Sequence, residues 1–465
     1  MTPKVLSFLG LGGNIEPRAK YLRDALESLR AIAGIAVLRT SMLYETQAMY
    51  ITDQASFLNA VVAIETVLEP AELLQAVKDI ERLSGRAQSD SSEYVRFGPR
   101  VIDIDILSYG EVILESEALT IPHPRLSERA FVLVPLLDVV EGDYKFPGFT
   151  ETVGELVARD PVSCTRVLAV GDKLLCLPSR LDYYSPVLMG IVNATPDSFA
   201  VSHGSFELAV EHAVKFSAEG AAIIDIGGVS TRPNAEWVET DEEWARIGDV
   251  LKSCVSDKFV VSVDTFRPEV AQQAIAAGAV IVNDVSGGFG HESMMSTVKH
   301  LRTPYIIMHI TPPESNPSNL NELLHRKSKS EDIIEKIARD LLNRVETARS
   351  LGIPDWDIIL DVGFGFGKSE DENWELVERF EQIRRYSNKV YDGLRNNLFA
   401  YPMVGGVSRK RFIRGSEDVG SLETIRRSVN CAVSLARKGC EILRVHDVSE
   451  TRQALNDEIL KALGG

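Results

Sequence analysis

Val260-Val-Ser-Val-Asp264 is a short apolar run that ends in a carboxylate, and two similar runs follow it, Val280-Ile-Val-Asn-Asp284 and Tyr305-Ile-Ile-Met-His309. Continuous apolar runs of this length, rich in β-branched residues, are typical of strands buried on both faces of a parallel sheet. Helical stretches separate the runs. They therefore predict consecutive strand–helix units, each with a polar residue at the end of its strand.

The same rhythm extends over residues 186–465. Eight strand–helix units in about 280 residues match the number and size of a (β/α)8 TIM barrel, and a doubly wound sheet is the alternative. The expected strands are 187–192, 222–226, 260–263, 280–282, 305–308, 358–360, 398–404 and 441–445.

Polar side chains stand at the end of each expected strand. Active sites of such barrels lie at the C-terminal ends of the strands, so this pattern predicts a binding site there. A single carboxylate in this place is more often the N-cap of the next helix, but the pattern holds for all eight strands. Carboxylates and amides suit a flat heterocycle with an amidine-like edge, whereas cationic groups suit an anion. The residues are Asn193, Asp225, Asp264, Asn283, Asp284, His309, Asp361, Ser408, Arg409, Lys410, Arg444, His446 and Asp447.

The front of the chain has a different organisation. Apolar runs alternate with amphipathic stretches between residues 5 and 139, which predicts an α+β or α/β domain over 1–159. Clear periodicity is lost over 160–185, where Pro161 and Pro178 occur and Pro186 follows, so we expect a linker there and a second domain over 186–465.

Composition limits the partners of the chain. Apolar residues make up 45% of it and charged residues 25%, and no apolar run approaches the roughly 20 residues that a membrane span needs. A net charge of −17 disfavours nucleic acid. The N-terminus lacks the features of a secretion signal, so a cytoplasmic location is expected. The five cysteines form no C-x-x-C pair, which argues against a zinc site or a disulfide framework.

Two carboxylates in the front half point to a metal. Asp103 and Asp105 alternate with apolar residues, so they project from one face of a strand and repel each other unless a divalent cation such as Mg²⁺ lies between them. A solvated sheet face is the simpler alternative for the pair alone. Cationic groups that suit phosphate oxygens flank it, which indicates phosphoryl transfer. They are Arg96, Arg100, His123 and Arg129.

The second half resembles the dihydropteroate synthases. The motifs that carry the resemblance include Asn193-Ala-Thr-Pro-Asp, Asp225-Ile-Gly-Gly-Val-Ser-Thr-Arg-Pro233, Asp361-Val-Gly-Phe-Gly-Phe-Gly-Lys368, Ser408-Arg-Lys410 and Arg444-Val-His446. The family implies a (β/α)8 barrel, usually dimeric, that joins a pterin-methyl pyrophosphate to p-aminobenzoate.

Roles in the barrel follow from this resemblance by position. It implies that the pterin is held by Asp264, Asn283, Met308, Asp361, Phe366 and Lys410. Pyrophosphate and its magnesium would be bound by Asn193, Arg444 and His446, and aminobenzoate by Thr231, Arg232 and Ser408. Asp264, Lys410 and Arg444 are the expected catalytic residues.

Residues 1–150 resemble 6-hydroxymethyl-7,8-dihydropterin pyrophosphokinase, on Gly12-Gly-Asn14, Phe57-Leu-Asn59, Arg96-Phe-Gly-Pro-Arg100, Asp103-x-Asp105 and Ile121-Pro-His123. The resemblance implies a ferredoxin-like sheet with helices and ATP as a substrate. The catalytic residues would be Asp103, Asp105, Arg96 and Arg100, with both carboxylates as magnesium ligands. ATP would be bound by Glu81, Arg100, His123 and Arg129, and the pterin by Asn59, Phe57 and Phe131.

Some positions depart from the two family patterns. They are Gln88, Ala200, Val229 and Val362. The main expectation is a bifunctional enzyme of folate synthesis, whose first product is the substrate of its second site. The alternative is a pterin-binding module of the methyltransferase type behind a degenerate front domain. That alternative gives no role to Thr231, Arg232, Ser408 and Lys410.

Overall fold

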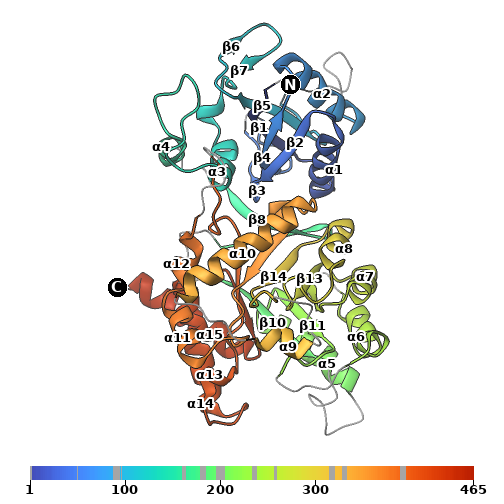
Figure 1. Ribbon diagram of the computed structural model, residues 1–465, viewed down its shortest axis with the longest axis vertical. Coiled ribbons are helices and arrows are strands. Elements are labelled where there is room, and N and C mark those ends of the chain that lie inside the picture. Colours follow the sequence, from blue (N-terminus) through green and yellow to red (C-terminus); the bar gives the residue numbers. More distant parts are fainter. Residues whose placement is uncertain are drawn as a thin grey trace. The chain divides into compact units, whose positions relative to one another are not determined.

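The structure is a computed structural model that describes residues 3–49, 51–86, 95, 97–159, 164–178, 185–194, 205–232, 238–255, 259–313, 320–326, 332–387 and 394–464. The chain falls into two compact units (Figure 1). The front unit comprises Met1–Cys176, Pro354–Trp356 and Ser387–Asn396, and the barrel unit comprises Leu177–Ile353, Asp357–Tyr386 and Asn397–Gly465. Each unit has a hydrophobic core of its own.

The front unit is built on an antiparallel sheet with the strand order β5-β1-β4-β3-β8-β9, in which β2 also pairs with β4. A short hairpin of β6 and β7 lies outside this sheet. The α+β expectation is confirmed. The strands are β1 (Val5–Gly13), β2 (Ile35–Thr40), β3 (Leu43–Thr46), β4 (Phe57–Thr66), β5 (Asp103–Tyr109), β6 (Leu114–Glu115), β7 (Thr120–Ile121), β8 (Thr165–Val170) and β9 (Lys173–Cys176).

Both faces of this sheet are covered. Successive side chains of a strand point to opposite faces, so Val62 of β4 packs into one apolar cluster and Val61 into another. Leu22 and Leu73 belong to the first cluster, and Leu136 belongs to the second. The helices that supply these clusters are α1 (Arg18–Ala31) and α2 (Pro70–Leu83) on one face, and α3 (Ala130–Val139) and α4 (Val153–Arg159) on the other.

Part of the expected linker is folded. Within 160–185, β8 pairs with β3 and β9 pairs with β8 in the sheet of the front unit. These strands carry no clear alternation, because Val167 and Leu168 are both fully buried. The front unit therefore extends to Cys176, past the boundary at residue 159 that the sequence indicated.

Two segments from far along the sequence complete the front unit. Trp356 is fully buried in the cluster that contains Leu22. Asp355 accepts a hydrogen bond of 2.8 Å from the backbone N–H of Thr40. In addition, Arg39 donates to Asn396 Oδ1 at 3.2 Å. The packing of this unit therefore depends on residues 354–356 and 387–396.

The described residues of the barrel unit form a closed barrel of eight parallel strands in sequential order, as expected, so the doubly wound alternative is wrong. The seventh strand begins later than the apolar run at 398–404 suggested, because Leu398 and Tyr401 lie in a turn. The strands are β10 (Val187–Asn193), β11 (Ile223–Gly227), β12 (Val260–Asp264), β13 (Ile281–Asp284), β14 (Tyr305–Met308), β15 (Ile358–Asp361), β16 (Met403–Gly405) and β17 (Ile442–Val445).

Helices surround the barrel and pack on its strands through apolar side chains. None of the described helices is long and apolar enough to cross a bilayer. The helices are α5 (Ser205–Ala218), α6 (Thr240–Cys254), α7 (Pro268–Ala276), α8 (Met294–Leu301), α9 (Leu320–His325), α10 (Ile333–Ser350), α11 (Glu370–Glu378), α12 (Phe380–Arg385), α13 (Arg411–Arg414), α14 (Leu422–Arg437) and α15 (Val448–Gly464).

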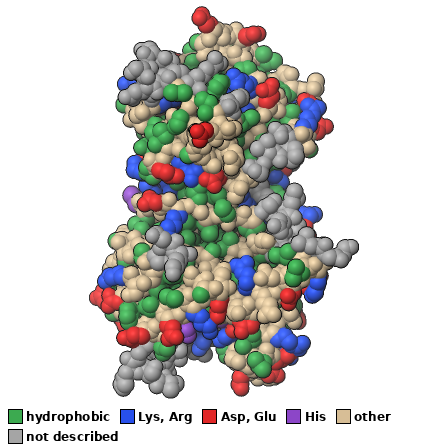
Figure 2. All heavy atoms as spheres, turned by 180° about the vertical axis from the view of Figure 1, so that it is seen from behind, with side chains coloured by type: hydrophobic (Ala, Val, Ile, Leu, Met, Phe, Trp, Pro, Cys, Tyr) green, Lys and Arg blue, Asp and Glu red, His purple; other side chains and the backbone are tan. Residues whose placement is uncertain are grey.

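Charged side chains of both signs are interspersed on the face drawn in Figure 2. Among the described residues on that face, basic side chains do not gather into one extended stripe. Extended basic surfaces are what binding to a nucleic-acid backbone requires.

Candidate functional site

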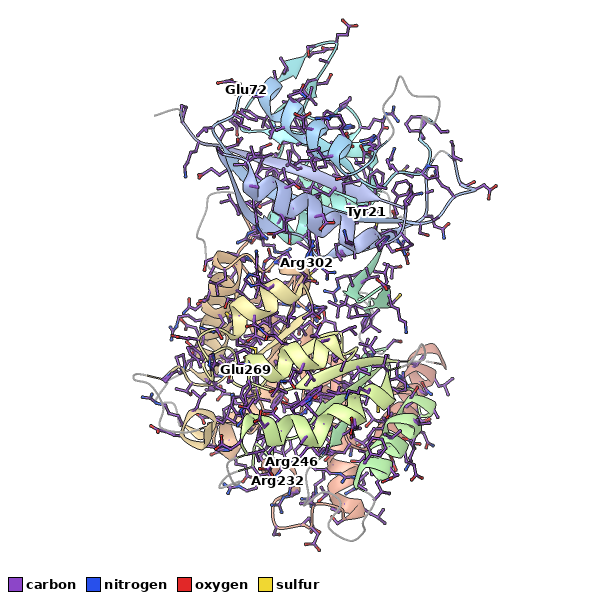
Figure 3. All side chains as sticks on the ribbon, turned by 90° about the vertical axis from the view of Figure 1, so that its right-hand side faces the viewer. Tyr21, Glu72, Arg232, Arg246, Glu269 and Arg302 are labelled. Carbon is purple, nitrogen blue, oxygen red and sulfur yellow. The ribbon has the colours of Figure 1, made fainter. Side chains whose placement is uncertain are left out.

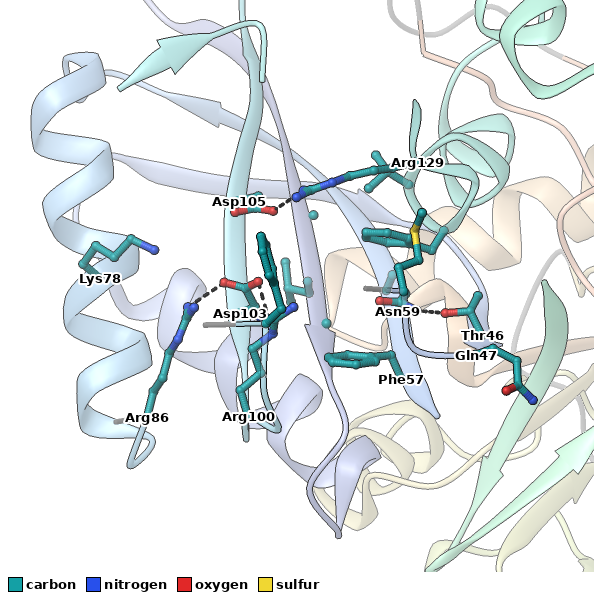
Figure 4. A pocket seen from close by; sticks show the side chains of 18 residues that line it. Thr46, Gln47, Phe57, Asn59, Lys78, Arg86, Arg100, Asp103, Asp105 and Arg129 are labelled. Atoms are coloured by element: carbon teal, nitrogen blue, oxygen red, sulfur yellow. Dashed lines mark hydrogen bonds and ion pairs between the residues drawn. The ribbon is translucent and has the colours of Figure 1, made fainter. Parts of the chain in front are cut away.

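The front unit contains a cavity of about 240 Å³ over one face of the strands β5, β1, β4 and β3 (Figure 4). The register of these strands places Gly12 opposite Asp103 and Gly10 opposite Asp105, and all four residues line the cavity. Because a glycine has no side chain, space is left above the two carboxylates. The polar and aromatic residues that line the cavity are Thr46, Gln47, Phe57, Asn59, Lys78, Arg86, Phe97, Arg100, Asp103, Asp105, Arg129 and Phe131.

Each of the two carboxylates is paired with arginine. Asp103 lies 2.5 Å from Arg86 Nη1 and 3.3 Å from Arg100 Nε, and Asp105 lies 2.9 Å from Arg129 Nη1 (Figure 4). Burial opposes the ionisation of Asp103, but Arg100 and Arg86 outweigh it, so the pKa of this carboxyl lies below its ordinary value. Asp103 is therefore ionised at neutral pH, as a metal ligand must be.

Glu81 and His123 are not among the residues that line the cavity; they support residues that do. The Glu81 carboxylate accepts a hydrogen bond of 2.8 Å from the backbone N–H of Ile104 and pairs with Lys78 and Arg86. Burial raises the pKa of Glu81. His123 Nε2 lies 3.4 Å from Arg129 Nη1, and burial lowers the pKa of this imidazole. The sequence assigned both residues to ATP.

Aromatic rings and one amide form another part of the cavity wall. The Arg100 guanidinium lies 5.0 Å from the centre of the Phe57 ring, and that of Arg129 lies 5.5 Å from the centre of Phe131. Asn59 Nδ2 donates to Thr46 Oγ1 at 2.9 Å, which fixes the orientation of this amide (Figure 4). Apolar rings beside an oriented amide can bind a flat heterocycle and read its edge.

Some residues of this cavity were not predicted, and two others cannot be assessed. Lys78, Gln47 and Arg86 line it, although none of them was assigned a role from the sequence. Lys78 stands three residues before Glu81 on α2, and residues with this spacing lie on the same face of a helix. This spacing is the feature of the sequence that could have indicated Lys78. Arg96, an expected catalytic residue, and Gln88 lie outside the described residues.

In the barrel unit, hydrogen bonds of Arg444 and Asp225 connect side chains from several strands near their C-terminal ends. Arg444 of β17 donates from Nε to Asp225 at 2.7 Å and from Nη2 to Asp264 at 2.6 Å. Asn283 of β13 also donates to Asp225, at 3.0 Å. Burial raises the pKa of Asp264, whereas the two carboxylates raise that of Arg444. Asp225 was expected at a strand end, but no role was assigned to it.

A second group surrounds the glycine-rich loop after β15. Lys410 Nζ lies 4.0 Å from the centre of the Phe366 ring, and Met308 is buried in the same apolar cluster as Phe366. Asp361 Oδ1 accepts a hydrogen bond of 2.8 Å from the backbone N–H of Gly363. Burial raises the pKa of Asp361 and lowers that of Lys410 to about 8. The structure thus brings together four of the expected pterin residues.

The expected anion and aminobenzoate residues lie at the same end of the barrel. Ser408 Oγ is within 3.0 Å of His446 Nδ1, and burial lowers the pKa of His446 to about 3. Arg232 is exposed on the loop after β11 (Figure 3), and Asn193 is the last residue of β10. His325 Nε2 lies 3.2 Å from the carbonyl oxygen of Thr231. This histidine also stacks on Phe366, a contact that the sequence did not predict.

Other strand-end residues serve the barrel itself. Asp284 accepts hydrogen bonds from Ser286 and from the Tyr305 hydroxyl, at 2.6 Å each. It therefore shapes the loop after β13. Val229 and Val362 lie on the loops that follow β11 and β15, and Ala200 lies outside the described residues. Among the described residues, no cluster of three or more His, Cys, Asp or Glu side chains could hold a metal by itself.

Two protein families match the chain. The pterin binding enzymes match residues 189–446, and the 7,8-dihydro-6-hydroxymethylpterin-pyrophosphokinases match residues 8–141. The chain is 37% identical over 476 residues to the folate synthesis bifunctional protein of Arabidopsis thaliana, covering 96% of this chain and 94% of that protein. It is 40% identical over 456 residues to the folic acid synthesis protein fol1 of Pneumocystis carinii, covering 95% of this chain but 58% of that longer protein.

Two solved structures are also similar to the chain. Xanthomonas albilineans dihydropteroate synthase with 4-aminobenzoic acid is 32% identical with a TM-score of 0.54, covering 65% of this chain and 99% of that one. The wild-type Plasmodium falciparum HPPK-DHPS with pteroate has the same fold, with a TM-score of 0.71 at 20% identity, covering 99% of this chain and 98% of that one. The chain therefore belongs to the family of bifunctional folate synthesis proteins, which join a hydroxymethyl-dihydropterin pyrophosphokinase to a dihydropteroate synthase.

Proposed function

We propose that the chain catalyses two consecutive steps of folate synthesis. The front unit transfers pyrophosphate from ATP to 6-hydroxymethyl-7,8-dihydropterin and releases AMP. The barrel unit then joins the pterin pyrophosphate to p-aminobenzoate, giving 7,8-dihydropteroate and pyrophosphate. The observation that carries the proposal is that one chain holds a cavity in the front unit and a side-chain cluster at the C-terminal ends of the barrel strands, each combining buried or half-buried carboxylates and an amide with cationic groups.

In the front cavity, Asp103 and Asp105 fit magnesium. They are hard oxygen donors on one strand face, and Mg²⁺ is usually held by one or two carboxylates together with substrate phosphates, so a three-ligand protein cluster is not needed. When bound, the ion would neutralise charge on the transferred group. Arg86, Arg100 and Arg129 hold phosphate oxygens, while Phe57, Asn59 and Phe131 orient the pterin.

In the barrel, Asp264, Asn283, Asp361 and Lys410 hold the pterin between Met308 and Phe366. Arg444, neutral His446 and Asn193 bind the departing pyrophosphate. Asn193 offers a single amide oxygen, which fits magnesium only as a supplement to phosphate oxygens. As pyrophosphate leaves, positive charge develops on the pterin methylene, and the Asp264 carboxylate stabilises it before the arylamine attacks. Thr231, Arg232 and Ser408 position the aminobenzoate.

Two features of the molecule extend the proposal. We infer that the barrel units form a homodimer, as the resemblance to dihydropteroate synthases implies. A cytoplasmic location is also proposed, although the relative from Pisum sativum is named as mitochondrial.

The pterin-binding module of the methyltransferase type is disfavoured, because Ser408 and His446 form a polar pair beside Arg444 that such a module does not need.

The complete chain is expected to convert hydroxymethyl-dihydropterin, ATP and p-aminobenzoate into AMP and dihydropteroate when Mg²⁺ is present. Chromatography of the products measures both steps in one reaction. Omitting p-aminobenzoate gives a control in which AMP forms without pteroate. If the complete mixture released AMP but gave no pteroate, the proposed activity of the barrel would be wrong.

The affinity of the barrel for its pterin substrate is expected to fall at alkaline pH. Burial lowers the pKa of Lys410 to about 8, so this lysine is charged below that pH and neutral above it. The charged fraction of a group with this pKa falls about tenfold between about pH 7 and pH 9. The KM for pterin pyrophosphate should rise by a similar factor. Lys410→Arg, which stays charged, should flatten the profile relative to its own value at pH 7, and an unchanged profile would contradict the assignment.

A further inference from the structure

Lys368 ends the glycine-rich loop after β15, and its amine is fully engaged by the protein. Its Nζ lies 2.7 Å from the Gly363 carbonyl oxygen, 3.2 Å from that of Phe366 and 3.1 Å from His309 Nδ1. Burial lowers the pKa of Lys368 to about 7, so below neutral pH the group is an ammonium with three N–H donors, and these three acceptors use all of them. Lys368 therefore has no donor left for a ligand and acts within the protein.

A polar chain behind Lys368 connects this loop to α10. His309 Nε2 lies 3.3 Å from Asp340 Oδ2, and Lys336 pairs with the same carboxylate. Burial lowers the pKa of His309 to about 3, so its ring is neutral and carries one N–H. Because an ionised carboxylate can only accept, that hydrogen lies on Nε2, and Nδ1 is free to accept from Lys368.

The loop that Lys368 holds carries part of the proposed pterin pocket. The Gly363 carbonyl accepts from Lys368, while the N–H of the same residue donates to Asp361 at 2.8 Å. The Phe366 carbonyl is held in the same way, and the ring of that residue lies against Lys410. Gly363 has a φ of +71°, and a Cβ atom there would overlap the His309 carbonyl, so the loop sits directly on β14.

We propose that Lys368 is a positioning residue for the pterin end of the barrel site. It fixes the backbone of Gly363 and Phe366, and through them the Asp361 carboxylate and the Phe366 ring. This inference rests on the proposed function of the barrel. Ser408 pairs with His446 and does not contact the loop through this network. Thr231 meets the loop only indirectly, through the ring of His325 that stacks on Phe366, so both residues at the aminobenzoate should be affected much less.

The test is Lys368→Met in the complete chain, which keeps the length of the side chain and removes its donors. The KM for pterin pyrophosphate in the barrel reaction reports on the pterin end alone, because only the barrel unit consumes this substrate. It is expected to rise by about 10- to 100-fold, as for lost supporting contacts elsewhere. The KM for p-aminobenzoate should stay within about twofold.

Lys438→Met is the matched control. Lys438 Nζ also has three acceptors, the carbonyl oxygens of Val377 and Glu378 and the Glu378 carboxylate, but it follows α14 at the end of the barrel where the strands begin. This variant loses the same kind of contacts and should bind the pterin normally. The kcat of the barrel reaction at saturating pterin pyrophosphate and p-aminobenzoate reports in each variant whether the barrel is folded.

Asp340→Asn provides a second route if Lys368→Met does not fold. The substitution keeps the shape of the side chain and weakens the orientation of His309, so a smaller loss of pterin affinity in the same direction is expected. The proposal is overturned if either folded variant has a KM for pterin pyrophosphate within twofold of the unaltered chain, or if the KM for p-aminobenzoate rises as much. An unaltered chain that forms no dihydropteroate from pterin pyrophosphate and p-aminobenzoate would overturn the proposed function as well.

Discussion

Replacing Asp103 and Asp105 together by alanine is expected to reduce AMP formation by on the order of 10²–10³-fold or more, because the cavity loses both of its carboxylates. The arginines that they pair with remain in place, so ATP can still bind through its phosphates. The variant loses the proposed magnesium site, and with it the ion that would neutralise charge on the transferred group. An assay of AMP release at saturating ATP and Mg²⁺ measures this loss.

Two controls separate this effect from unfolding. Pterin pyrophosphate supplied directly should still be converted to dihydropteroate by the barrel unit of the variant. Asp79→Ala changes a carboxylate on the exposed side of α2 that pairs with Arg82, and it should leave AMP formation unchanged. AMP formation that survived the double substitution would remove the magnesium assignment.

Asp264→Asn is expected to lower kcat of the barrel reaction by on the order of 10²-fold. The amide keeps the shape of the carboxylate but removes the negative charge that we place next to the developing cation. Arg444 would retain its hydrogen bond of 2.7 Å to Asp225, so the buried cation is not left without a partner. Steady-state kinetics with pterin pyrophosphate and p-aminobenzoate, each varied in turn, separates kcat from the two KM values.

The exposed carboxylate of Glu269 on α7 (Figure 3) offers a control for the loss of one negative charge. Glu269→Gln should have kcat within about twofold of the unaltered chain, as expected for a surface substitution. A kcat for Asp264→Asn within tenfold of that control would mean that this carboxylate does not stabilise the transition state.

Much of the fold could be predicted from local patterns. The apolar runs with polar ends mark seven barrel strands closely. In contrast, β2 and β3 were not expected, and β8 was assigned to a linker. Edge and short strands are fixed by their pairing partners, which an isolated stretch of sequence does not reveal.

The site residues divide in the same way. Asp103, Asp105, Asp264 and Lys410 could be found because strand periodicity or strand ends place them. The network of Lys368 could not be found, since its members come from a loop, a strand and a helix. Their contacts arise only when the barrel closes, and no spacing along the chain encodes them.

Trp356 and its neighbours also bear on how the protein is made. The ribosome synthesises the chain from its N-terminus, yet the sheet of the front unit receives Asp355 and Trp356 only after most barrel strands have been translated. Domains usually fold one after another during synthesis. Here the front unit cannot complete its apolar core until residues 354–356 have been synthesised. Both catalytic units are therefore expected to finish folding late and nearly together.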